Sequence, residues 1–170
     1  MAEPRIGSRA GTLGNGEAIE VRPFAEADRD GCAQVLARLP HWFGFPAVNA
    51  GYVAGLGRMP SWVASRNGAI AGFIAVEPRT AASAEIVVLA VAPELHRSGI
   101  GSALIAPAEA WLRERGFRFV YLLTLGPSDP DEGYARTRAF YAARGFSPLF
   151  ESTAFWGEAQ PALVLVKPLR

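Results

Sequence analysis

Residues 84–93, AEIVVLAVAP, form the apolar segment that most constrains how this chain can fold. Branched residues favour extended backbone, and so continuous an apolar run is typical of a strand buried on both faces in the middle of a sheet. Glu85 is the one charged residue in the run. The segment therefore predicts a central strand with a carboxylate near its start, on the face that it shares with Val87, Leu89 and Val91.

The remaining elements follow from periodicity and turn residues. Asn67-Gly68 joins two strand-like runs and is a strong hairpin signal. We expect strands at residues 18–24, 61–67, 68–78, 117–126, 147–156 and 161–169. We expect helices at 27–39, 48–58, 100–116 and 134–145, and Gly145 should end the last of them. This order predicts a mixed α/β (α+β) sheet with an antiparallel first half, and it argues against the regular alternation of a Rossmann domain.

Length and charge narrow the class of protein. The 170 residues, half of them hydrophobic, suit one domain with a sizeable core. A net charge of +1 gives no electrostatic case for binding nucleic acid or an anionic membrane. No apolar run of about 18 residues occurs, so no membrane span is expected. Residues 1–16 lack periodicity and a signal-peptide core, so we expect a flexible tail there.

Few residues can bind a metal or act as a thiol. Cys32 is the only cysteine, which excludes an intrachain disulfide and a cysteine-based zinc site. It falls on the apolar stripe of the first helix, which favours a small core residue over a nucleophile. His41 and His96 are far apart in sequence, so we expect no metal. These features fit a cytoplasmic protein.

A glycine-containing stretch, ELHRSGIGSAL at residues 94–104, follows the central strand. A P-loop is excluded because Ser102-Ala103, not Lys-Ser/Thr, follows its last glycine. A dinucleotide fingerprint is excluded because Leu104 stands where the third glycine belongs. Two interpretations remain open: an anion site at a helix N-terminus, with Arg97 adding charge, or a plain strand-to-helix turn.

Two motifs together resemble the GNAT superfamily of acyl-CoA-dependent N-acetyltransferases. The first is His96-Arg97-Ser98-Gly99-Ile100-Gly101 after the buried strand, and the second is Phe140-Tyr141 followed by Gly145-Phe146. The order of elements matches over residues 17–170. The resemblance implies one domain there, with a mostly antiparallel sheet of about seven strands, four flanking helices and a V-shaped split at the central parallel strands.

The resemblance implies acetyl-CoA as cosubstrate. Backbone groups of the central strand pair with pantetheine, the Val91 N–H polarises the thioester, and the amides of residues 97–102 meet the pyrophosphate. His96 stands where Arg or Gln is usual, and Tyr134 where many members have Asn. The cofactor-binding residues so implied are Leu89, Ala90, Val91, His96, Arg97, Ser98, Gly99, Ile100, Gly101, Ser102, Tyr134 and Tyr141.

The chemistry requires a base for the amine and an acid for the leaving thiolate. Glu85 is the candidate base, and its alternative is a solvated carboxylate at the strand's start. Tyr141 matches the family's tyrosine near the CoA sulfur, and its alternative is a core tyrosine. We expect direct acetyl transfer to a primary amine of a small molecule. Alternatives are a protein or peptide N-acetyltransferase and a non-catalytic acyl-CoA-binding domain; a homodimer is common among similar proteins.

Aromatic residues in two loops are the candidates for binding the acceptor. They are Trp42, Phe43 and Phe45 in residues 41–46, and Phe155 and Trp156 before the last strand. Such side chains suit a small, partly apolar amine. The alternative is that they only cover the end of the sheet.

Overall fold

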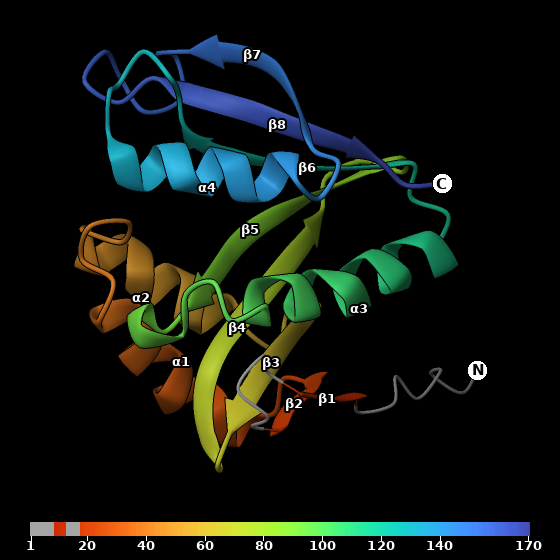
Figure 1. The fold of residues 1–170 in the computed structure, drawn as a ribbon. Coiled ribbons are helices and arrows are strands. Elements are labelled where there is room, and N and C mark those ends of the chain that lie inside the picture. The colour runs from red at the N-terminus through yellow and green to blue at the C-terminus, as the bar shows by residue number, and fades with distance from the viewer. Residues whose placement is uncertain (1–8, 13–17) are drawn as a thin grey trace. The chain divides into compact units, whose positions relative to one another are not determined.

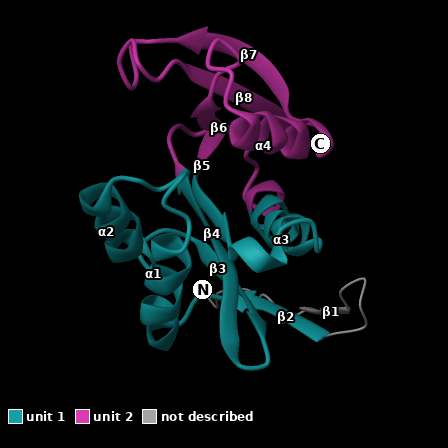
Figure 2. Cartoon of the chain, turned by 60° about the vertical axis from the view of Figure 1, so that its left-hand side comes forward, with its two compact units in different colours: residues 1–77, 87–111 teal, residues 78–86, 112–170 magenta. Residues whose placement is uncertain are grey.

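The computed structural model describes residues 9–12 and 18–170, and its elements are labelled in Figure 1. The described strands form one hydrogen-bonded series in the order β1-β2-β3-β4-β5-β6-β8-β7. The chain divides into two compact units: residues 1–77 with 87–111, and residues 78–86 with 112–170 (Figure 2). We call them unit 1 and unit 2. The strand β5 (Ser83–Val91) begins in unit 2 and ends in unit 1.

Unit 1 is an antiparallel series of strands with helices on both faces. Its elements are β1 (Arg9–Thr12), β2 (Ala18–Pro23), α1 (Arg29–Ala37), α2 (Pro46–Gly55), β3 (Ser61–Arg66), most of β4 (Ala69–Pro78), the end of β5 and most of α3 (Ile100–Glu114). Helices α1 and α2 lie on one face of the strands, and α3 lies on the other (Figure 2). The predicted helices and strands of this half are confirmed, with bounds shifted by a few residues.

The hairpin between β3 and β4 forms where Asn67-Gly68 predicts it. Both turn residues have left-handed backbone, with φ of 51° at Asn67 and 80° at Gly68, and Arg66 pairs with Ala69 across the turn. Two positive φ values in a row are what a two-residue hairpin of matching twist requires. This turn fixes the register of the two strands.

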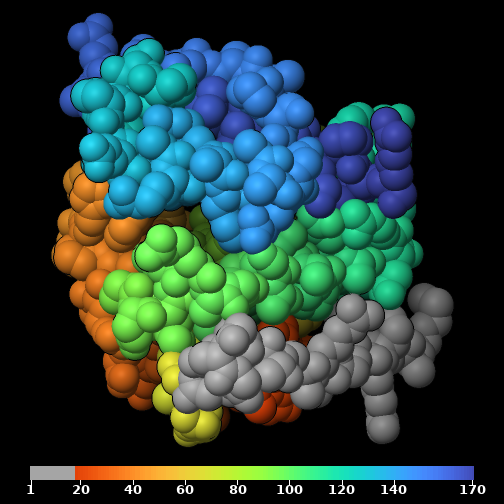
Figure 3. Space-filling view, in the orientation of Figure 1, coloured from red at the N-terminus to blue at the C-terminus, as the bar shows by residue number. Residues whose placement is uncertain are grey.

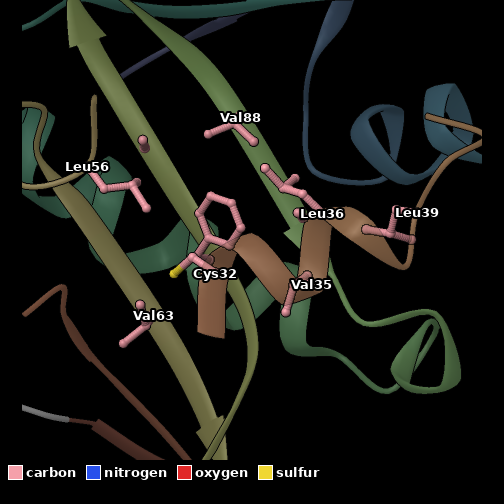
Figure 4. Close-up of a cluster of buried hydrophobic side chains, with 10 residues drawn as sticks. Cys32, Val35, Leu36, Leu39, Leu56, Val63 and Val88 are labelled. Atoms are coloured by element: carbon pink, nitrogen blue, oxygen red, sulfur yellow. The ribbon is translucent and has the colours of Figure 1, made fainter. Parts of the chain in front are cut away.

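The main core of unit 1 lies between α1 and the strands (Figure 4). Cys32 and Leu36 of α1 pack there with residues of three strands, among them Val63, Phe73 and Val88. Cys32, Val63 and Phe73 have no exposed surface. Burial of apolar surface of this kind stabilises by about 25 cal/mol per Å², so this face holds α1 against the sheet.

Helix α3 covers the opposite face of unit 1. Ile100, Leu104 and Ala108 are buried, as their helical spacing predicts. The ring of Trp111 lies edge-to-face on Trp62 of β3, with centroids 6.3 Å apart. The helix continues through Pro107, which lacks an N–H and so cannot bond four residues back.

Unit 2 contains the start of β5 and the C-terminal part of the chain. Its other elements are β6 (Phe119–Leu125), α4 (Glu132–Ala142), β7 (Ser147–Ser152) and β8 (Ala162–Pro168). The β5–β6 pair is parallel and covers Ser83–Glu85, with Glu85 opposite Tyr121. The pairs β6–β8 and β8–β7 are antiparallel. In the sheet, β8 therefore pairs with both strands and lies between β6 and β7.

Both ends of α4 are stabilised by local contacts. The Asp131 carboxylate accepts a hydrogen bond from the Tyr134 N–H at 2.8 Å, which is an N-cap. Gly145, just after the helix, has a φ of 82°, the left-handed conformation typical of a helix end. This confirms the predicted helix and the predicted role of Gly145.

The predicted fold class is confirmed: a mixed, mostly antiparallel sheet with four α-helices. The described residues form eight strands rather than about seven. The additional strand, β1, pairs antiparallel with β2 and lies within residues 1–16, where we expected a tail. The rest of that segment lies outside the described residues.

Candidate functional site

The strand β5 presents one half-exposed face and one buried face. Ala84, Ile86, Val88 and Ala90 are buried, whereas the residues between them are partly exposed. The prediction that Glu85, Val87, Leu89 and Val91 share a face is confirmed. The prediction that both faces are buried was wrong, because α1 covers only the side of Val88 and Ala90.

The end of β5 lies unusually close to β4. A Cβ placed on Gly72 would lie 2.7 Å from the carbonyl oxygen of Ala90 and 3.2 Å from the Cα of Val91. The next peptide is also bound, because the Ala92 N–H donates to the carbonyl of Ala71 at 2.9 Å. Only glycine permits this approach, so Gly72 helps to place the backbone of Val91.

The segment between β5 and α3 has the backbone of an anion-binding turn. Arg97 and Gly99 adopt left-handed conformations, with φ of 64° and 94°. The Ser98 hydroxyl donates to the Leu95 carbonyl at 2.6 Å and stabilises the turn. The Ala103 N–H bonds to the Gly99 carbonyl at 3.0 Å and closes the first turn of α3. Helical amides before that point lack a carbonyl four residues back within the helix.

Alternating left-handed residues before a helix N-terminus turn successive N–H groups toward one side, where an anion binds. Arg97 is exposed beside this turn, and the region forms part of the surface in Figure 3, in light green. Ile100 is fully buried, so it contributes its backbone, whereas Gly101 and Ser102 are partly exposed. The segment is therefore a candidate phosphate site.

The His96 side chain points back to β5. Its Nε2 atom lies 2.8 Å from the carbonyl oxygen of Val91. Its ring also lies edge-to-face on Trp42, with centroids 5.6 Å apart. His96 thus contacts both the end of the central strand and the loop between α1 and α2.

In unit 2, Glu85 is the centre of a small polar cluster. Arg79 donates to Glu85 Oε2 through Nε at 2.7 Å and forms an ion pair through Nη2 at 2.7 Å. The Tyr121 hydroxyl donates to the same oxygen at 3.4 Å. Burial, and then the charge of Glu85, raise the pKa of Tyr121. Glu85 is therefore not a solvated carboxylate: its side chain is 19% exposed and ion-paired.

Tyr141 lies in an aromatic cluster on α4, also in unit 2. Its ring lies edge-to-face on Phe140 and Phe146, with centroids 5.1 Å and 5.3 Å away. Tyr141 is buried, and burial raises its pKa well above the usual value, while the charge of Arg144 acts in the opposite direction. The hydroxyl therefore stays protonated at neutral pH. Tyr134 is partly exposed on the first turn of α4.

The aromatic residues predicted to bind an acceptor fall into two groups. Trp42 and Phe43 pack partly against the core cluster of unit 1, and Phe43 lies edge-to-face on Tyr52. Phe45, Phe155 and Trp156 are among the most exposed large apolar residues. The first group belongs to unit 1, and Phe155 and Trp156 belong to unit 2.

The remaining candidates contribute no chemistry. Cys32 is fully buried, and burial raises the pKa of its thiol to about 12, so it is no nucleophile at neutral pH. Among the described residues, no three His, Cys, Asp or Glu side chains come together as metal ligands. No helix in the described part of the chain is long and apolar enough to cross a membrane.

Three residues of these sites were not found from the sequence. Arg79 and Tyr121 reach Glu85 only through the turn after β4 and the parallel pairing of β5 with β6, and neither is encoded locally. Gly72 did carry a signal, since a glycine inside an apolar strand indicates close approach of another backbone.

Comparison with known proteins identifies related families and folds. The model of the acetyltransferase (GNAT) family matches residues 26–146. No curated protein sequence matches the chain. Among solved structures, a GNAT-family protein from Desulfovibrio desulfuricans is 22% identical, with a TM-score of 0.77, and the match covers 89% of this chain and 99% of that one.

Two further structures have the same fold. The ribosomal-protein-S18-alanine N-acetyltransferase from Escherichia coli is 19% identical, with a TM-score of 0.72 and coverage of 89% and 94%. An aminoglycoside 6'-N-acetyltransferase complexed with coenzyme A is 18% identical, with a TM-score of 0.72 and coverage of 88% and 97%. Because these sequence identities are low, the three structures show only that this chain shares their fold.

Proposed function

Because the chain belongs to the acetyltransferase (GNAT) family, we propose that it transfers an acetyl group from acetyl-CoA to a primary amine of a small molecule. The reaction is direct attack in a ternary complex. The amine nitrogen bonds to the thioester carbonyl carbon, the C–S bond breaks, and the products are the N-acetyl amide and free CoA. No acetyl-enzyme forms, and the buried Cys32 is consistent with this.

The turn before α3 is the observation that carries the proposal. Left-handed Arg97 and Gly99 precede a helix N-terminus, an arrangement that suits a pyrophosphate. The backbone amides of residues 97–102 and the Arg97 side chain would hold this part of acetyl-CoA. Ser98 is the exception, because its N–H donates to the Leu95 carbonyl at 3.3 Å. Leu89, Ala90 and Val91 would offer backbone groups to the pantetheine arm, and the Val91 N–H would stabilise the oxyanion. Tyr134 and Tyr141 complete the proposed cofactor set.

We propose that Glu85 is the general base that accepts the proton of the attacking amine. Among the described residues, Arg79 and Tyr121 both contact Glu85 through Oε2. Oε1 makes no hydrogen bond to any described residue, so it is the oxygen that would accept a proton, directly or through a water. Tyr141 would protonate the leaving CoA sulfur. Its buried hydroxyl is protonated at neutral pH, which a general acid requires.

The test follows thiol release from acetyl-CoA over a panel of primary amines. We expect CoA and acetyl-CoA to raise the Tm, at least one amine to release CoA, and Tyr141→Phe to lower kcat about 10²-fold. Absence of any Tm shift would overturn the cofactor assignment. Full turnover by Tyr141→Phe would remove the acid role and leave the rest standing.

A peptide acceptor is the second candidate. Phe45, Phe155 and Trp156 are exposed, and one structure of the same fold is a ribosomal-protein N-acetyltransferase. The panel therefore includes short peptides with free N-termini. Turnover of peptides but not of small amines would replace the first candidate with this one, and CoA binding without any turnover would indicate an acyl-CoA-binding domain.

A further inference from the structure

His96 occupies the position where the family pattern has Arg or Gln, but its donor is already used. A carbonyl can only accept a hydrogen bond, so the His96 Nε2 atom, 2.8 Å from the Val91 oxygen, carries the proton. The ring is therefore oriented toward β5, and its Nε2–H is not available to an anion at the start of α3.

The ring is held in this orientation by its neighbours. His96 lies edge-to-face on Trp42, with an interplanar angle of 76°. Trp42 lies edge-to-face on His41, with centroids 4.8 Å apart, and packs against the core cluster below α1. The core therefore fixes Trp42, and Trp42 restricts rotation of the exposed His96 ring.

The hydrogen bond from His96 is one of two that hold the Val91–Ala92 peptide. The Val91 carbonyl and the Ala92 N–H belong to the same peptide plane, which His96 binds at the oxygen and the Ala71 carbonyl binds at the N–H. On the other side of Val91, the Ala90 carbonyl oxygen lies 2.7 Å from the position that a Cβ on Gly72 would take. With both neighbouring peptides held, rotation about the Val91 backbone is restricted, and its N–H keeps one direction.

We propose that His96 is a positioning residue that locks the Val91–Ala92 peptide and thereby aims the Val91 N–H at the thioester oxygen. The pyrophosphate is left to the backbone amides of the turn and to Arg97. This inference rests on the proposed function, since the role of the Val91 N–H belongs to it. Through His96, the loop that contains Trp42 is also in contact with the Val91 backbone, and these residues all belong to unit 1.

The experiment compares His96→Phe with wild type. Phe retains a ring for Trp42 but has no donor, so packing is preserved and only the hydrogen bond is lost. We expect kcat for acetyl transfer to fall about tenfold, since small misplacement of a reacting group has effects of this size or larger. We expect the Kd for CoA, measured by calorimetry, to change less than about threefold. Arg97→Gln should weaken CoA binding more than it lowers kcat.

A second readout does not depend on catalysis. In the protein without CoA, His96→Phe and His96→Ala should each speed amide exchange of Ala92 about fivefold, because the peptide loses one of its two hydrogen bonds. Unchanged exchange in both variants would overturn the proposal. Weaker CoA binding with unchanged kcat would also overturn it and would make His96 a phosphate ligand. If wild type transfers no acetyl group, the proposed function fails, while the exchange measurement still decides whether His96 fixes the peptide.

Discussion

The two ends of β5 are held in different ways. At its start, Glu85 is bound by side chains, Arg79 and Tyr121. At its other end, Val91 is placed mostly by backbone: the strand approaches β4 at Gly72, and its peptide is bound by a neighbouring carbonyl and by His96. Both residues lie on the same half-exposed face of the strand.

The difference matches what each end is proposed to do. A base must change its protonation state, so it requires an ionisable side chain with charged neighbours. An oxyanion donor must neither titrate nor move, and a fixed backbone N–H meets both conditions. The comparison therefore predicts that changes at the Glu85 end alter the pH dependence, whereas changes at the Val91 end lower kcat without altering it.

The largest expected effect comes from Glu85→Gln. This change removes the proton acceptor and keeps the shape of the side chain, so kcat/KM should fall about 10²-fold and the rise of the rate with pH should flatten. Glu114→Gln, an exposed carboxylate at the end of α3, is the control and should behave as wild type. If the pH–rate profile of Glu85→Gln equals that of wild type, Glu85 is not the base.

Gly72→Ala tests the backbone end. The new Cβ would meet the carbonyl of Ala90, and backbone cannot yield as a flexible side chain does. We expect kcat to fall about tenfold and the free energy of unfolding to fall about 1–3 kcal/mol, with an unchanged pH profile. Denaturant titration and steady-state kinetics measure both.

Gly51→Ala is the matched control for this change. Gly51 lies in α2 with no atom within 4 Å of an added Cβ. Alanine should raise the free energy of unfolding by about 0.5–1 kcal/mol, because it favours helix. If both alanine variants behave alike, the approach of β4 to Val91 does not constrain the strand.

Tyr121→Phe removes the longer of the contacts to Glu85. The bond is 3.4 Å long, so we expect kcat/KM to change only about threefold. A loss as large as that of Glu85→Gln would mean that Tyr121 itself takes part in proton transfer.

The same variant tests the pKa of Tyr121. Burial and Glu85 raise that pKa in the folded protein, so its contribution to stability is fully present below the ordinary value near 10 and declines as pH rises through the raised value. Above pH 10, wild type should therefore lose more stability than Tyr121→Phe. Denaturant titrations below and above pH 10 measure this loss, and an equal loss in wild type and Tyr121→Phe would contradict the prediction.

The smallest effect is expected from Arg38→Gln. Arg38 pairs with Glu94 at 2.6 Å, and both side chains are about half exposed, at 53% and 52%. Such pairs contribute at most about 1 kcal/mol, and kcat should not change. A tenfold loss of kcat would mean that this ion pair, rather than His96, positions the segment after β5.

The elements of this fold were largely predictable because their signals are local. Asn67-Gly68 located the hairpin, and Gly145 located the end of α4. Pairing between distant strands was not predictable in this way. Nothing in residues 147–169 indicates that β8 lies between β6 and β7.

The sequence by itself determined the family, through two spaced motifs, and placed Glu85 and Val91 on one face of a central strand, because side chains alternate along every strand. Only the tertiary structure decided what surrounds them. Arg79 and Tyr121 meet Glu85 through strand pairing, and His96 meets Val91 through the turn before α3. These contacts depend on backbone paths and strand register, which distant parts of the chain settle together, so no local pattern of residues records them.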